Sequence, residues 1–541
     1  MGYISRADDR RLRALLKAQH TLFGGVIHGI DGAIVELQAR CTEILAVPGE
    51  PAQWQAAISG MARKPVNEAL DRVRGAIAAC GIRPPACEVT INLSPADLPK
   101  DGTWLDLPLA VIILQALGEL PDLPGDQEDD LILMGELSLH GEVRRVRGAL
   151  SMAFAAKPGQ LLVVPKANEK ECALITANPD HKGCRVASVS HLRDVVAFFR
   201  GESKLPNVLA QPISFEPIVQ KATDFAHVKG QDLAKEACLI AAAGGHNLLL
   251  IGPPGEGKSL LASAIPGILP RLTNPEKVAL TRIYSACGHL ESDGQAVTRR
   301  PMRPVHHTSS RQALVGGGTG IPRPGEVTLA HLGVLFLDEL AEFPRSSIEA
   351  LRQPIENGEV SIARVGGTMT FPARFTLLAA MNPCPCGYLG SEQCRCKPAQ
   401  VKKYLSKISG PIVDRIDLQV EMSRLSTEER FAEPPPPLSE KLRDQVELAR
   451  ERQSVRFRET GVAFNAAIPG GRVRDFCRFT AESLEHFRKL VDENTLTTRS
   501  IDRLAKVART VADLDGSEDL RPRDLDSAAR FVVGGILRDS F

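Results

Sequence analysis

The sequence contains Gly252-Pro253-Pro254-Gly255-Glu256-Gly257-Lys258-Ser259, a run that matches G-x-x-x-x-G-K-[ST] at every fixed position. The apolar stretch Asn247–Ile251 precedes it and reads as a strand, and Leu260–Ile265 follows it and reads as a helix. This strand–loop–helix context separates a phosphate-binding loop from a chance glycine-rich segment. In such a loop, backbone N–H groups surround the phosphates of ATP, Lys258 reaches the β- and γ-phosphates, and Ser259 ligates Mg²⁺. We therefore predict a nucleotide site that includes all eight residues.

A second apolar strand, Gly333–Leu337, ends in Asp338 and Glu339. Acidic residues end many strands, but this pair follows the phosphate-binding lysine by eighty positions (338 − 258), which strengthens the pattern. We predict that Asp338 completes the Mg²⁺ shell and that Glu339 polarises the attacking water. A third strand, Phe375–Met381, ends at Asn382, whose amide could orient the same water, although a polar residue after a strand is more often a turn former.

The whole chain has an ordinary globular composition. Its 541 residues are 43% hydrophobic and 24% charged, which predicts three to four domains of about 150 residues and excludes wholesale disorder. The 66 basic and 65 acidic residues exclude a uniformly basic nucleic-acid coat, and 4% aromatics argue against base stacking as the main binding device. Apolar runs are too short to span a bilayer, and no apolar stretch follows the N-terminus. We expect no membrane contact and a cytoplasmic location.

Three blocks separate along the chain. The first alternates short β-branched strands with helical patterns and reads as an α/β domain. The second is also α/β and carries the nucleotide motifs, and the third, which begins with four consecutive prolines, is helical in pattern. The predicted divisions are an N-terminal extension (1–20), an α/β domain (21–205), a linker (206–220), an α/β core (221–432) and a helical region (433–541).

Four of the 12 cysteines lie within thirteen positions, directly after the strand that ends at Asn382. Four thiolates satisfy tetrahedral Zn²⁺, and the glycines within the segment let the loop fold back on itself. The C-x-C spacing is tighter than the usual C-x₂₋₄-C, so redox-sensitive pairs or unligated thiols are the alternative. The predicted ligands of a structural Zn²⁺ are Cys384, Cys386, Cys394 and Cys396.

Further stretches narrow the class of nucleotide-binding protein, namely Pro304–Ser310, Gly316–Gly318, Pro322–Glu326 and Leu351–Gly358. With the motifs above, they resemble the magnesium-chelatase-like ComM/YifB family of bacterial AAA+ ATPases, from about residue 21 to the C-terminus. The resemblance implies a P-loop AAA+ α/β core, a helical lid of the magnesium-chelatase C-terminal type, ATP and Mg²⁺ as cofactors, and a homo-hexameric ring. For the better-understood members it also implies helicase and branch-migration activity on single-stranded or branched DNA during natural transformation.

Two arginines are assigned by the same resemblance. Gly410–Asp417 resembles the segment that places an arginine finger in the neighbouring subunit's site, which assigns that role to Arg415. Arg499 opens a lid helix where the family has its sensor-2 arginine. An arginine that stabilises transition-state charge contributes about 10³-fold or more in rate. A surface salt bridge is the alternative for each of them.

The N-terminal block resembles the Lon protease domain, an α/β fold of ribosomal S5-like type, through Pro99–Gly102, Gly135–Val143 and Val164–Glu169. Lon-type peptidases use a serine that a lysine activates. The corresponding positions here are Leu105 and Leu150, and leucine can neither attack a carbonyl nor accept a proton. We therefore predict a Lon-protease-like scaffold that lacks the Ser/Lys dyad.

The segment Glu359–Phe371 reads as two strands around a Gly-Gly turn and looks like the hairpin that related ring ATPases point into the pore. Arg364, near its tip, is the predicted DNA contact, and six such contacts per hexamer would compensate for the neutral chain. Between the nucleotide motifs lie further basic residues that could contact DNA or form intersubunit ion pairs, namely Arg299, Arg300, Arg303, Arg311 and Arg323. The adjacent His306 and His307 are expected to point to opposite sides of an extended segment and to serve in packing or a turn.

Three functions fit these observations. The first is an ATP-driven DNA translocase or helicase, the second is a chelatase motor subunit that acts through a protein partner, and the third is a regulatory, chaperone-like AAA+ protein without DNA. The Lon-like domain and the cysteine cluster favour the first, because true chelatase subunits by resemblance lack both. Stimulation of ATPase activity by DNA separates the first function from the others.

Overall fold

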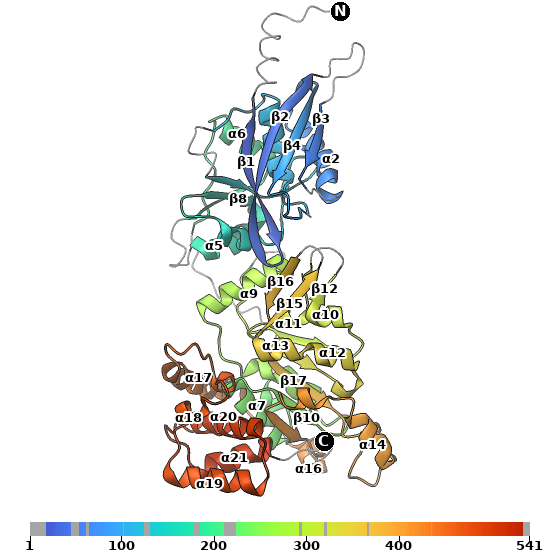
Figure 1. Cartoon of the computed structure of the whole chain (residues 1–541), viewed down its shortest axis with the longest axis vertical. Coiled ribbons are helices and arrows are strands. Elements are labelled where there is room, and N and C mark those ends of the chain that lie inside the picture. Colours follow the sequence, from blue (N-terminus) through green and yellow to red (C-terminus); the bar gives the residue numbers. More distant parts are fainter. Residues whose placement is uncertain are drawn as a thin grey trace, which may run out of the picture.

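The structure is a computed structural model, and it describes residues 18–44, 54–60, 64–100, 102–123, 130–176, 184–209, 223–290, 295–318, 322–364, 367–433 and 435–533. The predicted N-terminal extension lies outside the described residues up to residue 17. Figure 1 shows an elongated molecule, with the N-terminal α/β domain at one end, the nucleotide-binding core below it and the C-terminal helices at the other end. The predicted mixed α/β fold class is confirmed.

The N-terminal domain is built on a seven-stranded sheet of order β3-β4-β2-β1-β5-β8-β9. Its strands are β1 (His20–His28), β2 (Asp31–Ile44), β3 (Gln55–Ser59), β4 (Cys87–Ser94), β5 (Leu131–Leu133), β8 (Leu161–Pro165) and β9 (Arg185–Val189), with the ribbon β6 (Glu136–Leu137) and β7 (Val143–Arg144) beside them. Its helices are α2 (Lys64–Ala79), α3 (Asp106–Ala116), α4 (Ala149–Ala155), α5 (Glu169–Thr176) and α6 (Leu192–Phe199).

The two leucines at the Lon dyad positions belong to the core of this domain. Leu105 is 2% exposed and Leu150 is fully buried. A side chain on Gly24 of β1 would meet the Leu105 Cδ2 atom at 2.7 Å, so the glycine makes room for the leucine. Both positions are therefore filled by apolar packing, which excludes water and substrate from them.

The chain stays with the N-terminal domain slightly beyond residue 205. Ser188 N donates to the Pro206 carbonyl at 3.1 Å, and Val208 N donates to the Val186 carbonyl at 2.7 Å. Val208 is also 5% exposed within the domain core. The described part of the chain thus continues to bond to β9 up to Val208, three residues into the linker predicted over 206–220.

The nucleotide-binding core is a five-stranded, all-parallel sheet of order β11-β14-β17-β10-β18. The strands are β10 (Leu248–Ile251), β11 (Met302–Val305), β14 (Val334–Leu337), β17 (Thr376–Met381) and β18 (Leu418–Glu421). The strands β10 and β14 are buried at every residue, as expected for a parallel sheet with both faces covered. The predicted strands Asn247–Ile251, Gly333–Leu337 and Phe375–Met381 are confirmed to within one residue.

Short helices and strands surround this sheet. The helices are α7 (Asp232–Gly244), α8 (Lys258–Ala264), α9 (Asn274–Cys287), α10 (Arg311–Val315), α11 (Glu326–Leu329), α12 (Arg345–Ala350), α13 (Arg352–Asn357), α14 (Pro398–Leu405), α15 (Gly410–Val413) and α16 (Thr427–Phe431). The predicted hairpin is present as β15 (Glu359–Arg364) and β16 (Gly367–Pro372), and a smaller ribbon is formed by β12 (Gly316–Gly317) and β13 (Arg323–Pro324).

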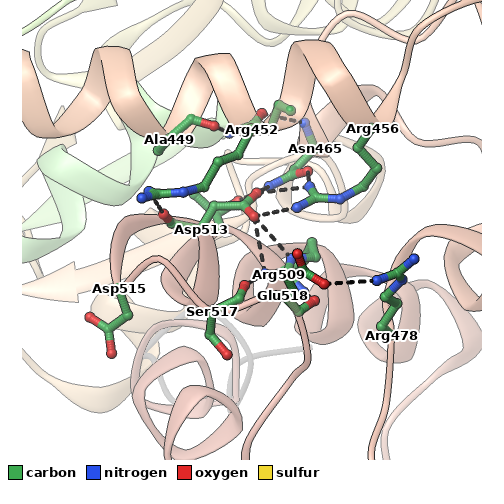
Figure 2. Close-up of polar contacts among 12 residues, drawn as sticks. Ala449, Arg452, Arg456, Asn465, Arg478, Arg509, Asp513, Asp515, Ser517 and Glu518 are labelled. Carbon is green, nitrogen blue, oxygen red and sulfur yellow. Dashed lines mark hydrogen bonds and ion pairs between the residues drawn. The ribbon is translucent and has the colours of Figure 1, made fainter.

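The C-terminal region is helical, with α17 (Ser439–Arg456), α18 (Val473–Phe476), α19 (Ala481–Glu493), α20 (Thr498–Leu514) and α21 (Pro522–Val532). A buried ionic network holds these helices together, and Figure 2 shows Asp513 of α20 at its centre. The Asp513 carboxylate is fully buried and accepts hydrogen bonds from Arg456 of α17, from Arg509 of α20 and from the Asn465 amide. Because two guanidinium groups share one buried carboxylate, we expect this network to contribute strongly to lid stability.

The core and the N-terminal domain meet along α9 and the hairpin. Gly148 N, at the start of α4, donates to the Ser285 carbonyl of α9 at 3.1 Å, and Arg282 of α9 pairs with Asp31 of β2. A side chain on Gly29, in the β1–β2 turn, would lie 3.3 Å from the Phe371 ring of β16. In Figure 1, α9 and the β15–β16 hairpin accordingly lie directly under the N-terminal domain. Among the described residues, no helix combines the length and apolar character that a bilayer crossing requires.

Candidate functional site

The predicted phosphate-binding loop connects β10 to α8 at the carboxyl edge of the parallel sheet. Gly255 and Gly257 have φ values of +82° and +91°, a conformation that side chains beyond glycine rarely adopt. The sequence therefore needs glycine at these two positions to bring the loop back over the end of β10. Glu256, between them, is 6% exposed, accepts a hydrogen bond from Leu425 N at 3.1 Å and pairs with Arg430 of α16 at 3.0 Å.

Lys258 points into this loop. Its ammonium donates to the carbonyls of Gly252 and Pro253 at 2.6 and 2.7 Å, and to Asn382 Oδ1 at 3.1 Å. Burial lowers the pKa of Lys258, while the nearby carboxylates of Asp338, Glu256 and Glu339 oppose that shift. Asn382 comes directly after β17, the neighbour of β10, so sheet order brings it to the lysine. The two predicted site residues are therefore in contact.

The predicted Mg²⁺ ligands also lie together. Ser259 Oγ donates to Asp338 Oδ2 at 2.8 Å, which joins the end of the phosphate-binding loop to the end of β14. A hydroxyl and a carboxylate are oxygen donors of the kind that Mg²⁺ prefers, and a carboxylate plus substrate phosphates is its usual protein environment. The donor set fits Mg²⁺.

Glu339 follows Asp338 in a left-handed turn with φ of +55°, an uncommon conformation for a glutamate. Its backbone N–H donates to Asp338 Oδ1 at 3.0 Å. Its side chain is half exposed, and its Oε2 atom lies 2.8 Å from His307 Nδ1. The expectation that His306 and His307 point apart is wrong. They lie beyond the end of β11, where the strand alternation has ceased, and their ring centroids are 4.1 Å apart.

The two predicted arginines lie at the opposite edge of the sheet. Arg415 Nη2 pairs with Glu356 of α13 at 2.6 Å, and Arg499 Nη1 pairs with Asp414 at 3.0 Å. Arg499 also acts on Glu356, whose pKa is lowered first by the hydrogen bond to Arg415 and then by the charges of Arg415, Arg352 and Arg499. The two arginines therefore form one cluster with Glu356 and Asp414.

This cluster is tied to the amino end of β10. Asn247 Nδ2 donates to the Arg415 carbonyl at 2.8 Å, and Asn247 N donates to Asp417 Oδ2 at 3.0 Å. The phosphate-binding loop leaves the carboxyl end of the same strand, four residues later. At about 3.3 Å per residue, the two ends are separated by at least about 10 Å. The structure thus brings Lys258, Ser259, Asp338, Glu339 and Asn382 together and places Arg415 and Arg499 elsewhere.

The four predicted zinc ligands converge. The sulfur atoms of Cys384 and Cys386 are 3.3 Å apart, those of Cys386 and Cys394 are 3.8 Å apart, and all four, with Cys396, lie within 4.8 Å of one another. Tetrahedral Zn²⁺ with Zn–S bonds of about 2.3 Å needs sulfurs about 3.8 Å apart, so the donor set fits Zn²⁺. The loop packs on the nucleotide site, because a side chain on Gly387 would meet Pro254 at 2.6 Å.

A groove of about 200 Å³ lies where this cysteine loop faces the phosphate-binding loop. Its lining includes Pro253, Tyr388, Met422 and Arg424. The Arg424 guanidinium lies 5.1 Å from the centroid of the Tyr388 ring and donates to Gln393 at 2.6 Å. The sequence analysis did not single out these groups, because they meet only after β17 and β18 have taken their places beside β10.

The proposed DNA-contacting residues are only partly described. Arg364 ends β15, opposite Gly367, and its side chain lies outside the described residues. Arg300 is bonded to Glu276 at 2.9 Å, and Arg303 to Glu326 at 2.6 Å, so both are engaged within the chain. Arg311 and Arg323 are exposed.

The functional group that sequence reasoning missed is His307. A usable signal was present, because Met302–Val305 is a short apolar-containing stretch that ends just before the histidine pair. Once these residues are recognised as a strand next to β14, the histidines must lie at the same sheet edge as Asp338 and Glu339.

Comparisons with protein families match three parts of the chain. The family described as magnesium chelatase, subunit ChlI, matches residues 224–430. The family described as subunit ChlI of Mg-chelatase matches residues 45–168. The magnesium chelatase subunit ChlI C-terminal family matches residues 437–531.

Relatives are similar over most of the chain. It is 40% identical over 518 residues to an uncharacterized protein of Mycobacterium tuberculosis, covering 95% of this chain and 99% of the relative. It is 41% identical over 484 residues to YifB of Escherichia coli (87% and 90%), and 39% identical over 472 residues to the competence protein ComM of Haemophilus influenzae (85% and 88%). A magnesium-chelatase 67 kDa subunit of Chlorobaculum tepidum is 28% identical over 167 residues, covering 29% of this chain and 23% of that protein. The chain therefore belongs to the magnesium-chelatase-like ComM/YifB family of AAA+ proteins.

Proposed function

We propose that this AAA+ motor protein is a Mg²⁺-dependent ATP hydrolase that works as a homo-hexameric ring on single-stranded or branched DNA, with helicase or branch-migration activity. The observation that carries the proposal is the division of the catalytic groups between two edges of one parallel sheet. The phosphate-binding half lies at the carboxyl edge, and the two arginines lie at the amino edge. A ring that sets one subunit's amino edge against the next subunit's carboxyl edge completes every site.

Each residue at the carboxyl edge has a distinct role in this proposal. The eight residues of the phosphate-binding loop hold ATP, with Lys258 moving from its carbonyl partners to the β- and γ-phosphates. Mg²⁺, held by Ser259 and Asp338, neutralises developing phosphate charge. Glu339 accepts the proton of the attacking water, and Asn382 orients that water. The general base contributes about 10²- to 10⁴-fold in rate.

Arg415 and Arg499 act on the nucleotide of the neighbouring subunit. In the single chain their charges are held by Glu356 and Asp414. In the ring, the phosphates of the adjacent site compete with these carboxylates for the guanidinium groups. Charge-assisted bonds to phosphate are stronger than exposed ion pairs, so the exchange is favourable.

The remaining parts serve as structural supports. Residues 21–205, with Leu105 and Leu150 buried, form a Lon-protease-like scaffold without peptidase activity, residues 221–432 form the ATPase core, and residues 433–541 form the lid. The four clustered cysteines hold one structural Zn²⁺, whose four thiolate ligands leave no position open for catalysis.

DNA contact is assigned to the β15–β16 hairpin, with Arg364 at its tip. The hairpin lies between the core and the N-terminal domain, where Phe371 approaches Gly29. One arginine per subunit gives six phosphate contacts in a hexamer, each of which releases counterions and makes binding salt-dependent.

A motor that acts on a protein partner is the second candidate, because the chelatase subunit families and a 67 kDa chelatase subunit are also similar to this chain. The two are separated by measuring ATP hydrolysis with and without DNA, and unwinding of a three-strand or Holliday-junction substrate with and without ATP. DNA-stimulated hydrolysis and ATP-dependent unwinding support the DNA motor. ATPase activity that ignores DNA, together with no unwinding, would reject it in favour of a protein-directed motor.

A further inference from the structure

The end of strand β11 delivers a histidine to the proposed catalytic base. Strand β11 pairs with β14 in parallel register, with Val305 opposite Leu337. The two residues that follow each strand are therefore neighbours, which places His306 and His307 beside Asp338 and Glu339. His307 Nδ1 lies 2.8 Å from Glu339 Oε2.

Glu339 needs such a partner, because little else restrains its side chain. The side chain is 51% exposed and leaves the chain from a left-handed turn. Among the described residues, His307 is the side chain recorded at ion-pair distance from this carboxylate. The carboxylate remains close enough to Lys258 for its charge to raise the lysine pKa against the effect of burial. His307 thus meets Glu339 while the glutamate faces the phosphate-binding lysine.

His307 is itself held in place on two sides. Its ring packs edge-on against Phe343, a buried residue, with centroids 6.5 Å apart. Its other neighbour is the His306 ring, whose Nδ1 lies 3.0 Å from Thr308 Oγ1. The Nδ1 atom of His307 is shielded from solvent, and no described residue gives it a well-aligned hydrogen bond. A buried nitrogen that faces one carboxylate is suited to complete that bond when the site closes, since catalytic hydrogen bonds often tighten only with substrate bound.

We propose that His307 is a positioning residue that orients Glu339 for proton abstraction from the attacking water. The inference rests on the proposed ATP hydrolysis. It follows the general arrangement in which a third group orients a catalytic base. His307 donates from Nδ1 to one carboxylate oxygen, which leaves the other oxygen directed at the water. The imidazole touches neither nucleotide nor water, so its loss affects turnover and spares nucleotide binding.

The test measures ATP binding and steady-state hydrolysis in the full-length protein for His307→Ala, His307→Asn and the neighbouring control His306→Ala. Asparagine can place an N–H near the position of Nδ1. We expect His307→Ala to lower kcat about 10- to 100-fold, within the range of general-base contributions, with an ATP dissociation constant within about 2-fold of the parent. His307→Asn should recover much of the loss, and His306→Ala should stay near the parental kcat.

A second comparison removes both groups. Because residues that act as a unit are not additive, His307→Ala should cost little further activity in a Glu339→Gln background. Parental kcat in His307→Ala, or a loss of ATP affinity and melting temperature as large as the loss of kcat, would overturn the positioning role. A parental chain that hydrolyses no ATP, or a Glu339→Gln variant that hydrolyses it normally, would overturn the proposed function and this inference together. Normal Glu339-dependent hydrolysis with an inert His307 would overturn the inference alone.

Discussion

Arg499 Nη1 lies 3.0 Å from Asp414 Oδ2, and Asp414 directly precedes Arg415 in the chain. Lid helix α20 is thereby tied to the segment that carries the proposed finger, and Arg503, one turn further along α20, strengthens the tie by donating to the Asp414 carbonyl at 2.7 Å. Both proposed catalytic arginines consequently belong to the same surface of the subunit. A change in the lid is transmitted to both at once.

Arg415→Ala is expected to leave ATP binding intact and to make the assembled ring nearly inactive, because the variant keeps its own phosphate-binding loop and loses what it donates. The cost is about 4 kcal/mol or more of transition-state stabilisation per site, from an effect of 10³-fold or more. Mixing Arg415→Ala with Lys258→Ala subunits should restore some ATPase activity, because some interfaces then combine an intact Arg415 with an intact Lys258. Mixed rings as inactive as both parents would contradict the trans role.

Arg499→Ala should show the same complementation with Lys258→Ala, because Arg499 lies with Arg415 at the amino edge. An arginine that served its own subunit's nucleotide would instead leave the loss in the same subunit as the Arg499→Ala change. Mixing Arg499→Ala with Arg415→Ala distinguishes the two cases. If both arginines act in trans from one surface, each interface in that mixture lacks one of them and activity stays low. Recovery to the level of the Arg415→Ala/Lys258→Ala mixture would place Arg499 in cis.

Lys258→Ala should abolish nucleotide binding, whereas Glu339→Gln should keep binding and stop hydrolysis. Lys258 neutralises phosphate charge that is present in the ground state, while Glu339 acts only on the attacking water. Equilibrium binding of a fluorescent ATP analogue and phosphate release measure the two effects separately. Hydrolysis at the parental rate by Glu339→Gln would show that the base has been wrongly assigned.

Cys394→Ser is expected to lower zinc content from about one ion per chain, since a tetrahedral site that loses one of four thiolates binds the metal much more weakly. Mass spectrometry under native conditions and elemental analysis give the content directly. Cys477→Ser is the matched control, because that cysteine is buried in the lid and lies outside the cluster. Metal-free protein in both the parent and Cys394→Ser would end the zinc proposal.

Asp513→Ala should destabilise the lid by about 3 to 5 kcal/mol, because it leaves the buried guanidinium groups of Arg456 and Arg509 without their carboxylate. Asp515, close by in Figure 2, is a suitable control, since it is half exposed and pairs with Arg521 and Arg523 at the surface. Asp515→Ala should cost at most about 1 kcal/mol. Denaturant unfolding of both variants gives the comparison, and equal costs would contradict the buried-network account.

The sequence by itself determined the elements and the type of chemistry. The predicted helices Ser439–Arg458, Thr480–Glu493 and Arg499–Ala512 correspond to α17, α19 and α20, with ends that differ by at most two residues. The phosphate-binding loop, the acidic pair after β14 and the clustered cysteines were also readable. All of these depend on local properties, namely hydrophobic periodicity, turn-forming glycines and short-range spacing, which neighbouring residues impose on one another.

Tertiary structure alone decided which of these residues meet. The order β11-β14-β17-β10-β18 sets Asn382 against Lys258 and His307 against Glu339, and it separates Arg499 from the phosphate-binding loop of its own chain. Strand order arises from packing between segments far apart in the sequence, and the local pattern of one strand carries no information about its neighbour in the sheet. A histidine pair after an unrecognised strand therefore reads as a turn, and only the assembled sheet makes it a partner of the catalytic glutamate.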